Sequence, residues 1–246
     1  MLLTVITRDR ARQMIGLIDL TNLDDRCHAD AIDALCAAAM QHEVAAVCVW
    51  PDFVAQAAAA VSGSPVRVAT VVNFPTGDER AFAVSRLTAG CVDDGADEID
   101  VVLPYRAFAA GDLDHCSDVL RATRLATAGT AHLKVILETG ELVEAALVAT
   151  ASRFAIEHGA DFIKTSTGKS PVSATPEAMS TMLDAIAEAD RTVGIKPSGG
   201  IRTVADAELY LGLAEHRLGT DWPTPETFRF GASSLLDALL GAMREA

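Results

Sequence analysis

The sequence predicts an α/β fold, a single (β/α)8 barrel formed by residues 1–246 as one domain. Eight short runs rich in β-branched residues recur along the chain, separated by Ala- and Leu-rich stretches with helical spacing. The runs are apolar at nearly every position, which is typical of parallel strands covered by helices. Eight such units in a chain of this length favour a closed TIM barrel over an open doubly wound sheet, and no Gly-, Pro- and Ser-rich linker divides them into two domains.

The expected strands follow the apolar runs in chain order. They are residues 16–20, 44–50, 66–73, 97–103, 132–138, 161–165, 192–196 and 227–230. Helices are expected between them, most clearly over residues 29–40, 78–94 and 175–190. Thr175, Pro176 and Glu177 supply an N-cap, a first-turn proline and a first-turn acid, and Thr203–Asp206 is a similar opening after the seventh strand.

The composition excludes several classes of protein. Lys and Arg number 20 against 34 Asp and Glu, a formal charge of −14, so we expect no binding to nucleic acid or to an anionic membrane. The five cysteines are scattered, which favours reduced thiols over a disulfide framework or a zinc ribbon. The sequence shows neither a secretory signal nor an apolar run of about 18 residues. We therefore expect a cytoplasmic protein.

Charged residues interrupt or end several of the apolar strands. They are Asp19, Asp100, Lys134, Glu138, Lys164 and Lys196. In a barrel enzyme the chemistry lies at the carboxyl ends of the strands, so these are the informative positions. A single buried lysine is readily explained as the partner of a carboxylate on the next strand. Three lysines together with these acids predict a functional cluster instead, because burying each charge costs several kcal/mol unless it is paired.

Two of these lysines predict a reaction class. An ordinary ammonium, with a pKa of about 10.4, is protonated at neutral pH and cannot attack a carbonyl. Apolar surroundings and a second cation lower that pKa, so one lysine becomes a nucleophile because another stays charged. Lys164 and Lys196 end the sixth and seventh strands, which are neighbours in a barrel. We therefore expect Schiff-base catalysis.

Glycines and hydroxyl residues follow the last three strands. Residues 165–169 read TSTGK, residues 197–200 read PSGG, and residues 230–234 read FGASS. Glycines let backbone N–H groups approach an anion, and barrels commonly bind phosphate in the loops after strands seven and eight. The six histidines show no metal-binding spacing, and no Gly-rich nucleotide-binding motif is present, so we expect neither a metal nor a nucleotide cofactor.

At these residues the sequence resembles the deoxyribose-phosphate aldolases, a class I aldolase family. The most specific matches are GADFIKTSTGK at 159–169 and VGIKPSGGIRT at 193–203, and further matches extend over nearly the whole chain. The resemblance implies reversible cleavage of 2-deoxy-D-ribose 5-phosphate to acetaldehyde and D-glyceraldehyde 3-phosphate. It implies no metal or organic cofactor, and it suggests a homodimer.

The resemblance also implies roles for individual residues. Lys164 would form the Schiff base, Lys196 would be the cation that lowers its pKa, and Asp100 would be the general acid and base. Asp19 and Lys134 would support this polar network. The residues expected around the phosphate are Thr167, Gly168, Lys169, Gly199, Gly200, Ser233 and Ser234.

Two alternatives share the barrel. Another Schiff-base aldolase or a transaldolase would keep the nucleophilic lysine and use a different donor or acceptor. A non-catalytic sugar-phosphate-binding barrel would bind the ester without forming an imine, and it would leave the lysines without a purpose. Some members of the family also end in a tail with a terminal tyrosine, whereas the tyrosines here are Tyr105 and Tyr210, so we expect proton transfer without such a tail.

Overall fold

The computed structural model describes residues 6–127 and 129–245. Its eight strands form one sheet in the order β7-β6-β5-β4-β3-β2-β1-β8, and every neighbouring pair is parallel. Bridges from Ile195 to Phe228 and from Ser198 to Gly231 connect the two ends of that order. The predicted (β/α)8 barrel is therefore confirmed.

The strands are short and almost entirely buried. They are β1 (Ile18–Asn22), β2 (Ala46–Val49), β3 (Arg67–Val72), β4 (Glu98–Val102), β5 (His132–Ile136), β6 (Phe162–Lys164), β7 (Gly194–Lys196) and β8 (Phe230–Ala232). The last strand begins at Phe230 rather than at residue 227, where the sequence suggested a start. Thr227 instead closes a turn, because its N–H donates to the carbonyl of Thr224 and its Oγ1 accepts from the Thr224 N–H.

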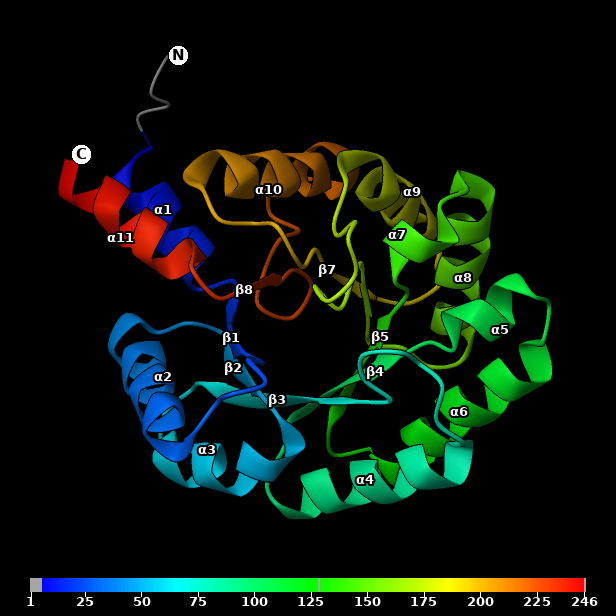
Figure 1. The fold of residues 1–246 in the computed structure, drawn as a ribbon. Coiled ribbons are helices and arrows are strands. Elements are labelled where there is room, and N and C mark those ends of the chain that lie inside the picture. The colour runs from blue at the N-terminus through cyan, green and yellow to red at the C-terminus, as the bar shows by residue number, and fades with distance from the viewer. Residues whose placement is uncertain (1–5, 128, 246) are drawn as a thin grey trace.

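Helices surround the strands, as Figure 1 shows. They are α1 (Arg8–Ile15), α2 (Ala29–His42), α3 (Val54–Ala60) with the 3-10 turn η1 (Pro51–Phe53), α4 (Ala81–Asp93), α5 (Tyr105–Ala109), α6 (Leu113–Ala126), α7 (Thr139–Leu142), α8 (Ala145–Glu157), α9 (Pro176–Ala187), α10 (Val204–Leu218) and α11 (Leu235–Glu245). Each strand is followed by at least one helix, and α1 packs beside α11. Among the described residues, no helix is long and apolar enough to cross a membrane.

The predicted helix caps are present. The Thr175 side chain accepts from the N–H of Ala178 at the start of α9. At the start of α10, Thr203 and Asp206 form a reciprocal capping box. Both caps satisfy backbone donors that the first turn of a helix leaves free.

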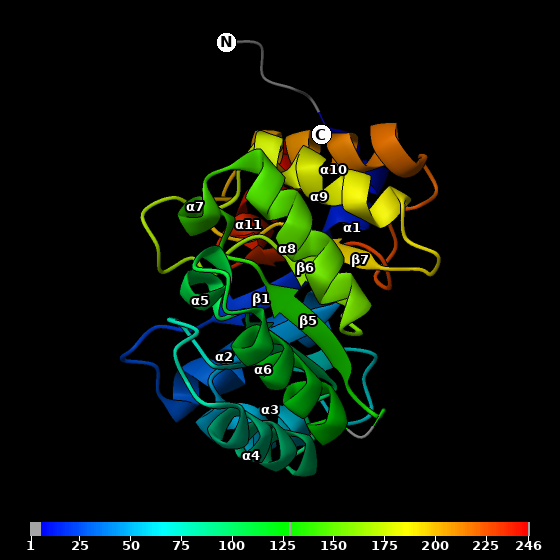
Figure 2. The same ribbon diagram turned by 90° about the vertical axis from the view of Figure 1, so that its right-hand side faces the viewer.

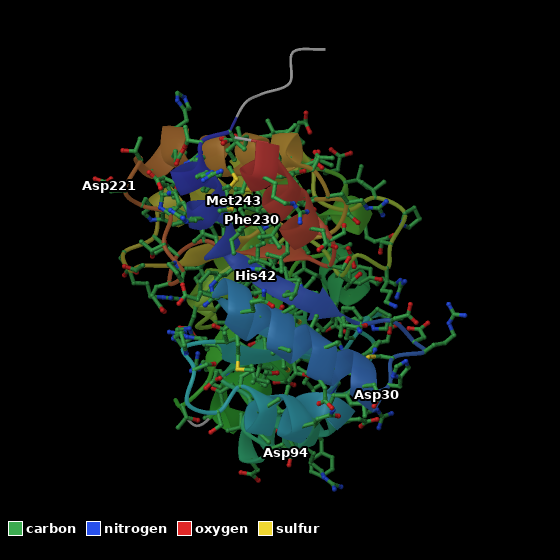
Figure 3. The ribbon with its side chains drawn as sticks, turned by 90° about the vertical axis from the view of Figure 1, so that its left-hand side faces the viewer. Asp30, His42, Asp94, Asp221, Phe230 and Met243 are labelled. Carbon is green, nitrogen blue, oxygen red and sulfur yellow. The ribbon has the colours of Figure 1, made fainter. Side chains whose placement is uncertain are left out.

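The carboxyl ends of the strands define the mouth of the barrel. In Figure 2 the arrow of β5 points toward the short helices α5 and α7, which lie in the loops after β4 and β5. In Figure 3, Asp30 near the start of α2 marks the mouth side, and Asp221 in the loop before β8 lies on the opposite side. We call that opposite end the base.

The barrel interior is divided into an apolar wall and a charged wall. Strands β2 and β3 contribute a small apolar cluster, Ala46, Cys48, Ala69 and Val71, all buried. The charged side chains come from the other strands. A Cβ on Gly194 would lie 2.3 Å from Cε1 of Phe162, so the seventh strand needs a glycine where this ring fills the interior.

Candidate active site

The barrel brings together all five residues predicted to be catalytic. In the ladders between neighbouring strands, Lys164 is paired with Lys196, and Asp100 with Lys134. Asp19, on β1, reaches the same cluster through Lys196. Lys164 is 2% exposed and the other four are 0% exposed. The cluster is therefore buried inside the barrel, and each member must find its partner there.

Asp100 connects the three lysines. Its Oδ2 accepts from Nζ of Lys164 at 2.9 Å and from Nζ of Lys196 at 2.7 Å. Its Oδ1 accepts from Nζ of Lys134 at 2.9 Å. The two strand-end lysines thus share one carboxylate oxygen, which holds their nitrogens close together.

Two further buried residues complete this cluster, and sequence reasoning missed both. Arg229 donates from Nη1 to Oδ1 of Asp19 at 2.6 Å and from Nη2 to Oε1 of Glu98 at 2.8 Å. Oε2 of Glu98 lies 2.5 Å from Nζ of Lys134. Oδ2 of Asp19 lies 2.5 Å from Nζ of Lys196. We call these seven residues the ionic network: Asp19, Glu98, Asp100, Lys134, Lys164, Lys196 and Arg229.

The charges of the ionic network balance when Lys164 is neutral. Three carboxylates then face three cations, which are Lys134, Lys196 and Arg229. Arg67 and Glu226, paired at the base, add one charge of each sign. Because an uncompensated charge is costly in a buried site, protonating Lys164 is unfavourable here.

The local environment shifts the pKa values of Lys164 and Lys196 in opposite directions. Burial lowers the pKa of Lys164, and the nearby Lys196 lowers it further, against the opposing effect of Asp100. Burial also acts to lower the pKa of Lys196, but Asp100 and Asp19 more than offset it, so that this pKa is raised. These directions are those that a nucleophilic Lys164 beside a charged Lys196 requires.

A cavity of about 510 Å³ opens at the mouth, between the loops that follow β1, β6, β7 and β8. Six of the residues predicted to bind phosphate line it: Thr167, Gly168, Lys169, Gly199, Gly200 and Ser233. Ser234 is not part of this lining. It directly precedes α11, and its side chain is exposed.

The loops after β6 and β7 meet through glycine. Gly199 has a φ of 82°, and a Cβ there would lie 2.5 Å from Oγ of Ser173 and 3.2 Å from Cα of Gly168. Only glycine tolerates this combination of backbone angle and close approach. The cavity wall is therefore mostly backbone at this point, as an anion site requires.

Two cations lie at this cavity. Nζ of Lys169 donates to the carbonyl of Leu23 at 2.9 Å and pairs with Asp25 at 2.9 Å, so it ties the β6 loop to the β1 loop. Arg202 also lines the cavity, and its side chain is exposed. Sequence reasoning missed Arg202, although its place directly after the Gly-Gly-Ile of the seventh loop is the available signal.

Comparisons with known proteins show the family to which the chain belongs. Residues 13–241 match the model of the family described as DeoC/LacD family aldolase. The chain belongs to this aldolase family. It is 51% identical over 239 residues to the deoxyribose-phosphate aldolase of Agrobacterium fabrum, a match that covers 96% of this chain and 92% of that protein.

Solved structures show the same fold. A protein from Coccidioides immitis assigned as a deoxyribose-phosphate aldolase superposes with a TM-score of 0.84 at 31% identity, covering 94% of this chain and 86% of that one. The tetrameric deoxyribose phosphate aldolase of Aeropyrum pernix superposes with a TM-score of 0.81 at 22% identity, covering 96% and 93%. The second likeness extends to the fold alone.

In the part of this aldolase that the structure describes, Glu138 forms no ion pair with the lysines with which the sequence grouped it. It follows β5 and has a φ of 54°. Its buried carboxylate accepts from both the N–H and the hydroxyl of Thr167, and Oγ1 of Thr167 in turn accepts from the N–H of Lys169 at 3.0 Å. Glu138 therefore fixes the loop after β6 at the cavity.

Proposed function

We propose that this chain catalyses the reversible cleavage of 2-deoxy-D-ribose 5-phosphate to acetaldehyde and D-glyceraldehyde 3-phosphate. The observation that supports this most is the arrangement of Lys164, buried beside Lys196 and Asp100 in a network that balances only when Lys164 is neutral. The identity of 51% to the Agrobacterium fabrum enzyme supports the choice of substrate.

The proposed reaction begins on Nζ of Lys164. The neutral amine adds to C1 of the open-chain sugar, and loss of water gives an iminium. A base takes the proton of the C3 hydroxyl, the C2–C3 bond breaks, and its electron pair moves toward the iminium to form an enamine. The enamine takes a proton at C2, and water then hydrolyses the iminium to release acetaldehyde and regenerate Lys164.

The network residues have distinct proposed roles. Lys196 remains the cation that keeps Lys164 unprotonated, and Asp100 accepts and returns protons beside Nζ of Lys164, working through a bound water. Asp19 and Lys134 hold these two groups in place. The apolar wall, which includes Cys48, is proposed to face the two-carbon unit bound to Lys164.

The phosphate is proposed to bind in the mouth cavity. Backbone N–H groups at Gly168, Gly199 and Gly200 and the hydroxyl of Ser233 offer donors, and Lys169 and Arg202 supply positive charge. Thr167, whose own hydroxyl donates to Glu138, is proposed to line the phosphate site. Ser234, at the start of α11, is proposed to contribute its backbone N–H rather than its side chain.

A substrate panel tests this function. We expect rapid cleavage of deoxyribose 5-phosphate, measured as release of glyceraldehyde 3-phosphate, with much slower cleavage of unphosphorylated deoxyribose and of fructose 1,6-bisphosphate. Preferential cleavage of the fructose phosphate would favour another Schiff-base aldolase. Binding of deoxyribose 5-phosphate without turnover would favour a sugar-phosphate-binding barrel.

Glu138→Gln should weaken phosphate recognition selectively. Oε2 of Glu138 accepts both hydrogen bonds from Thr167, and a neutral amide oxygen accepts them more weakly than an ionised carboxylate does, so the loop after β6 loses part of its anchor. We expect KM for deoxyribose 5-phosphate to rise about tenfold, with kcat changed little. Glu141→Gln, an exposed acid in α7, is the matched control and should leave KM unchanged. An equal loss toward unphosphorylated deoxyribose would contradict the anchoring role.

The proposal extends to assembly, domain organisation and location. We expect one domain and a homodimer, whereas the Aeropyrum pernix relative is tetrameric. Sedimentation velocity distinguishes these two assemblies. All five cysteines are unpaired, which supports the cytoplasm as the location.

A further inference from the structure

We propose that Glu98 and Arg229, at the base of the barrel, are positioning residues that hold the catalytic lysines in the charge states that the reaction needs. The inference rests on the proposed function, because it concerns the same nucleophile. Neither residue touches Lys164, so each would act through the members of the ionic network that lie between them and the mouth.

Arg229 is held rigidly in the interior. Its side chain is 0% exposed, and its guanidinium binds Asp19 with Nη1 and Glu98 with Nη2. The same group lies 5.7 Å from the ring centroid of Phe162, which fills the interior beside it. An arginine with this many fixed partners stays charged, and it orients both carboxylates.

The second oxygen of each of these carboxylates contacts a lysine that lies nearer the mouth. Oδ2 of Asp19 contacts Nζ of Lys196 at 2.5 Å. Oε2 of Glu98 contacts Nζ of Lys134 at 2.5 Å. Lys134 and Lys196 then both bind Asp100, whose Oδ2 receives Lys164. Two branches of ion pairs thus start at Arg229 and meet at Asp100, which binds Lys164.

The charged and titratable groups of this network and around it come from strands β1 to β7 and from the segments directly after β5 and before β8. Lys164 faces Asp100, Lys196 and Cys48, and Glu138 is near enough to interact with its charge. Glu98 faces Arg229, Lys134, Asp19 and Arg67, and Nη1 of Arg67 lies 3.3 Å from Oε1 of Glu98. At the base surface, Arg67 also contacts Glu226 and Nδ1 of His132.

The charge balance predicts that Glu98→Gln and Arg229→Met move the pKa of Lys164 in opposite directions. Glu98→Gln removes a negative charge at nearly constant shape, so the network becomes more positive and protonation of Lys164 becomes less favourable. Arg229→Met removes a positive charge, so protonation becomes more favourable. A purely structural role predicts lower activity in both variants and no such opposition.

The experiment follows imine formation against pH. Acetaldehyde is trapped with borohydride between pH 5 and 10, and the adduct on Lys164 is quantified by peptide mass spectrometry. Unit charges roughly 10 Å apart at an effective dielectric constant of about 20 shift a midpoint by about one pH unit. We expect the midpoint to fall by about this amount in Glu98→Gln and to rise by about this amount in Arg229→Met.

Two further variants make the result specific. Arg229→Lys keeps the charge and should keep the wild-type midpoint, even if turnover falls. Arg124→Met removes a partly buried ion pair with Asp161, outside the ionic network, and should leave the midpoint unchanged. If Arg229→Met does not fold, the midpoints of Glu98→Gln and Arg229→Lys still test whether these residues set the protonation of Lys164.

Unchanged midpoints in folded Glu98→Gln and Arg229→Met, or shifts of the same sign, would overturn the proposal. A second readout separates it from the proposed function. The rate at which trinitrobenzenesulfonate labels Lys164 follows the fraction of neutral amine and needs no substrate. If wild-type protein traps no acetaldehyde, the proposed function fails, and the labelling midpoints still test the role of Glu98 and Arg229.

Discussion

Lys164→Leu is expected to reduce kcat/KM for deoxyribose 5-phosphate cleavage by about 10⁴- to 10⁶-fold, because it removes the amine that we propose forms the covalent intermediate. Leucine suits the buried site, and it leaves the balanced part of the ionic network intact, since the remaining three acids still face three cations. A coupled assay for glyceraldehyde 3-phosphate measures the loss.

Circular dichroism and thermal unfolding serve as the control for Lys164→Leu. The variant should keep the wild-type spectrum and a similar Tm, so that the lost activity reflects the missing amine. Activity above about 1% of wild type in a folded variant would contradict the assignment of Lys164 as the nucleophile, because the reaction would then proceed without its amine.

Lys196→Leu is expected to lower kcat/KM at pH 7 by about 10²-fold or more. Without this cation, Asp100 and Asp19 lose a partner, and the pKa of Lys164 rises. Each unit of that rise leaves tenfold less neutral amine at a pH below the pKa. We therefore expect the acidic limb of the pH profile of kcat/KM to move toward higher pH, with activity partly recovered in alkaline buffer.

Lys196→Arg is the matched control, because it keeps a positive charge beside both carboxylates. Its acidic limb should stay near that of the wild type even if its kcat is reduced. An acidic limb of Lys196→Leu that coincides with the wild-type limb would show that Lys196 does not set the protonation of Lys164.

Much of the fold could be predicted from local patterns. Buried parallel strands are apolar at nearly every position, which makes them visible in the sequence. Thr175 and Thr203 indicate where their helices begin, because capping depends only on neighbouring residues. The eighth strand was predicted too early, because the side chains of 227–230 look like a strand. Its true start at Phe230 depends on pairing with Ile18, a contact that exists only once the barrel closes.

The site could be predicted where charge interrupts an apolar strand. Lys164, Lys196 and Asp100 are conspicuous for that reason. Glu98 is equally buried, but it is the second residue of its predicted strand, where a charged residue is ordinary. Arg229 lies between Phe228 and Phe230 in the predicted eighth strand, so a charge interrupts that apolar run as well. Their partnership joins residues 131 positions apart, and nothing in the sequence indicates that separation. Glu138 was grouped with the lysines because it ends an apolar run, whereas a turn at φ 54° directs it to Thr167.

The chain has only four lysines, Lys134, Lys164, Lys169 and Lys196, and all of them lie in the barrel interior or at its mouth. Borohydride trapping with acetaldehyde, followed by peptide mass mapping, can therefore assign the nucleophile without ambiguity. We expect one ethylated lysine, Lys164, at neutral pH. An adduct confined to another lysine, or no adduct under conditions in which the protein cleaves deoxyribose 5-phosphate, would contradict the proposed Schiff-base mechanism.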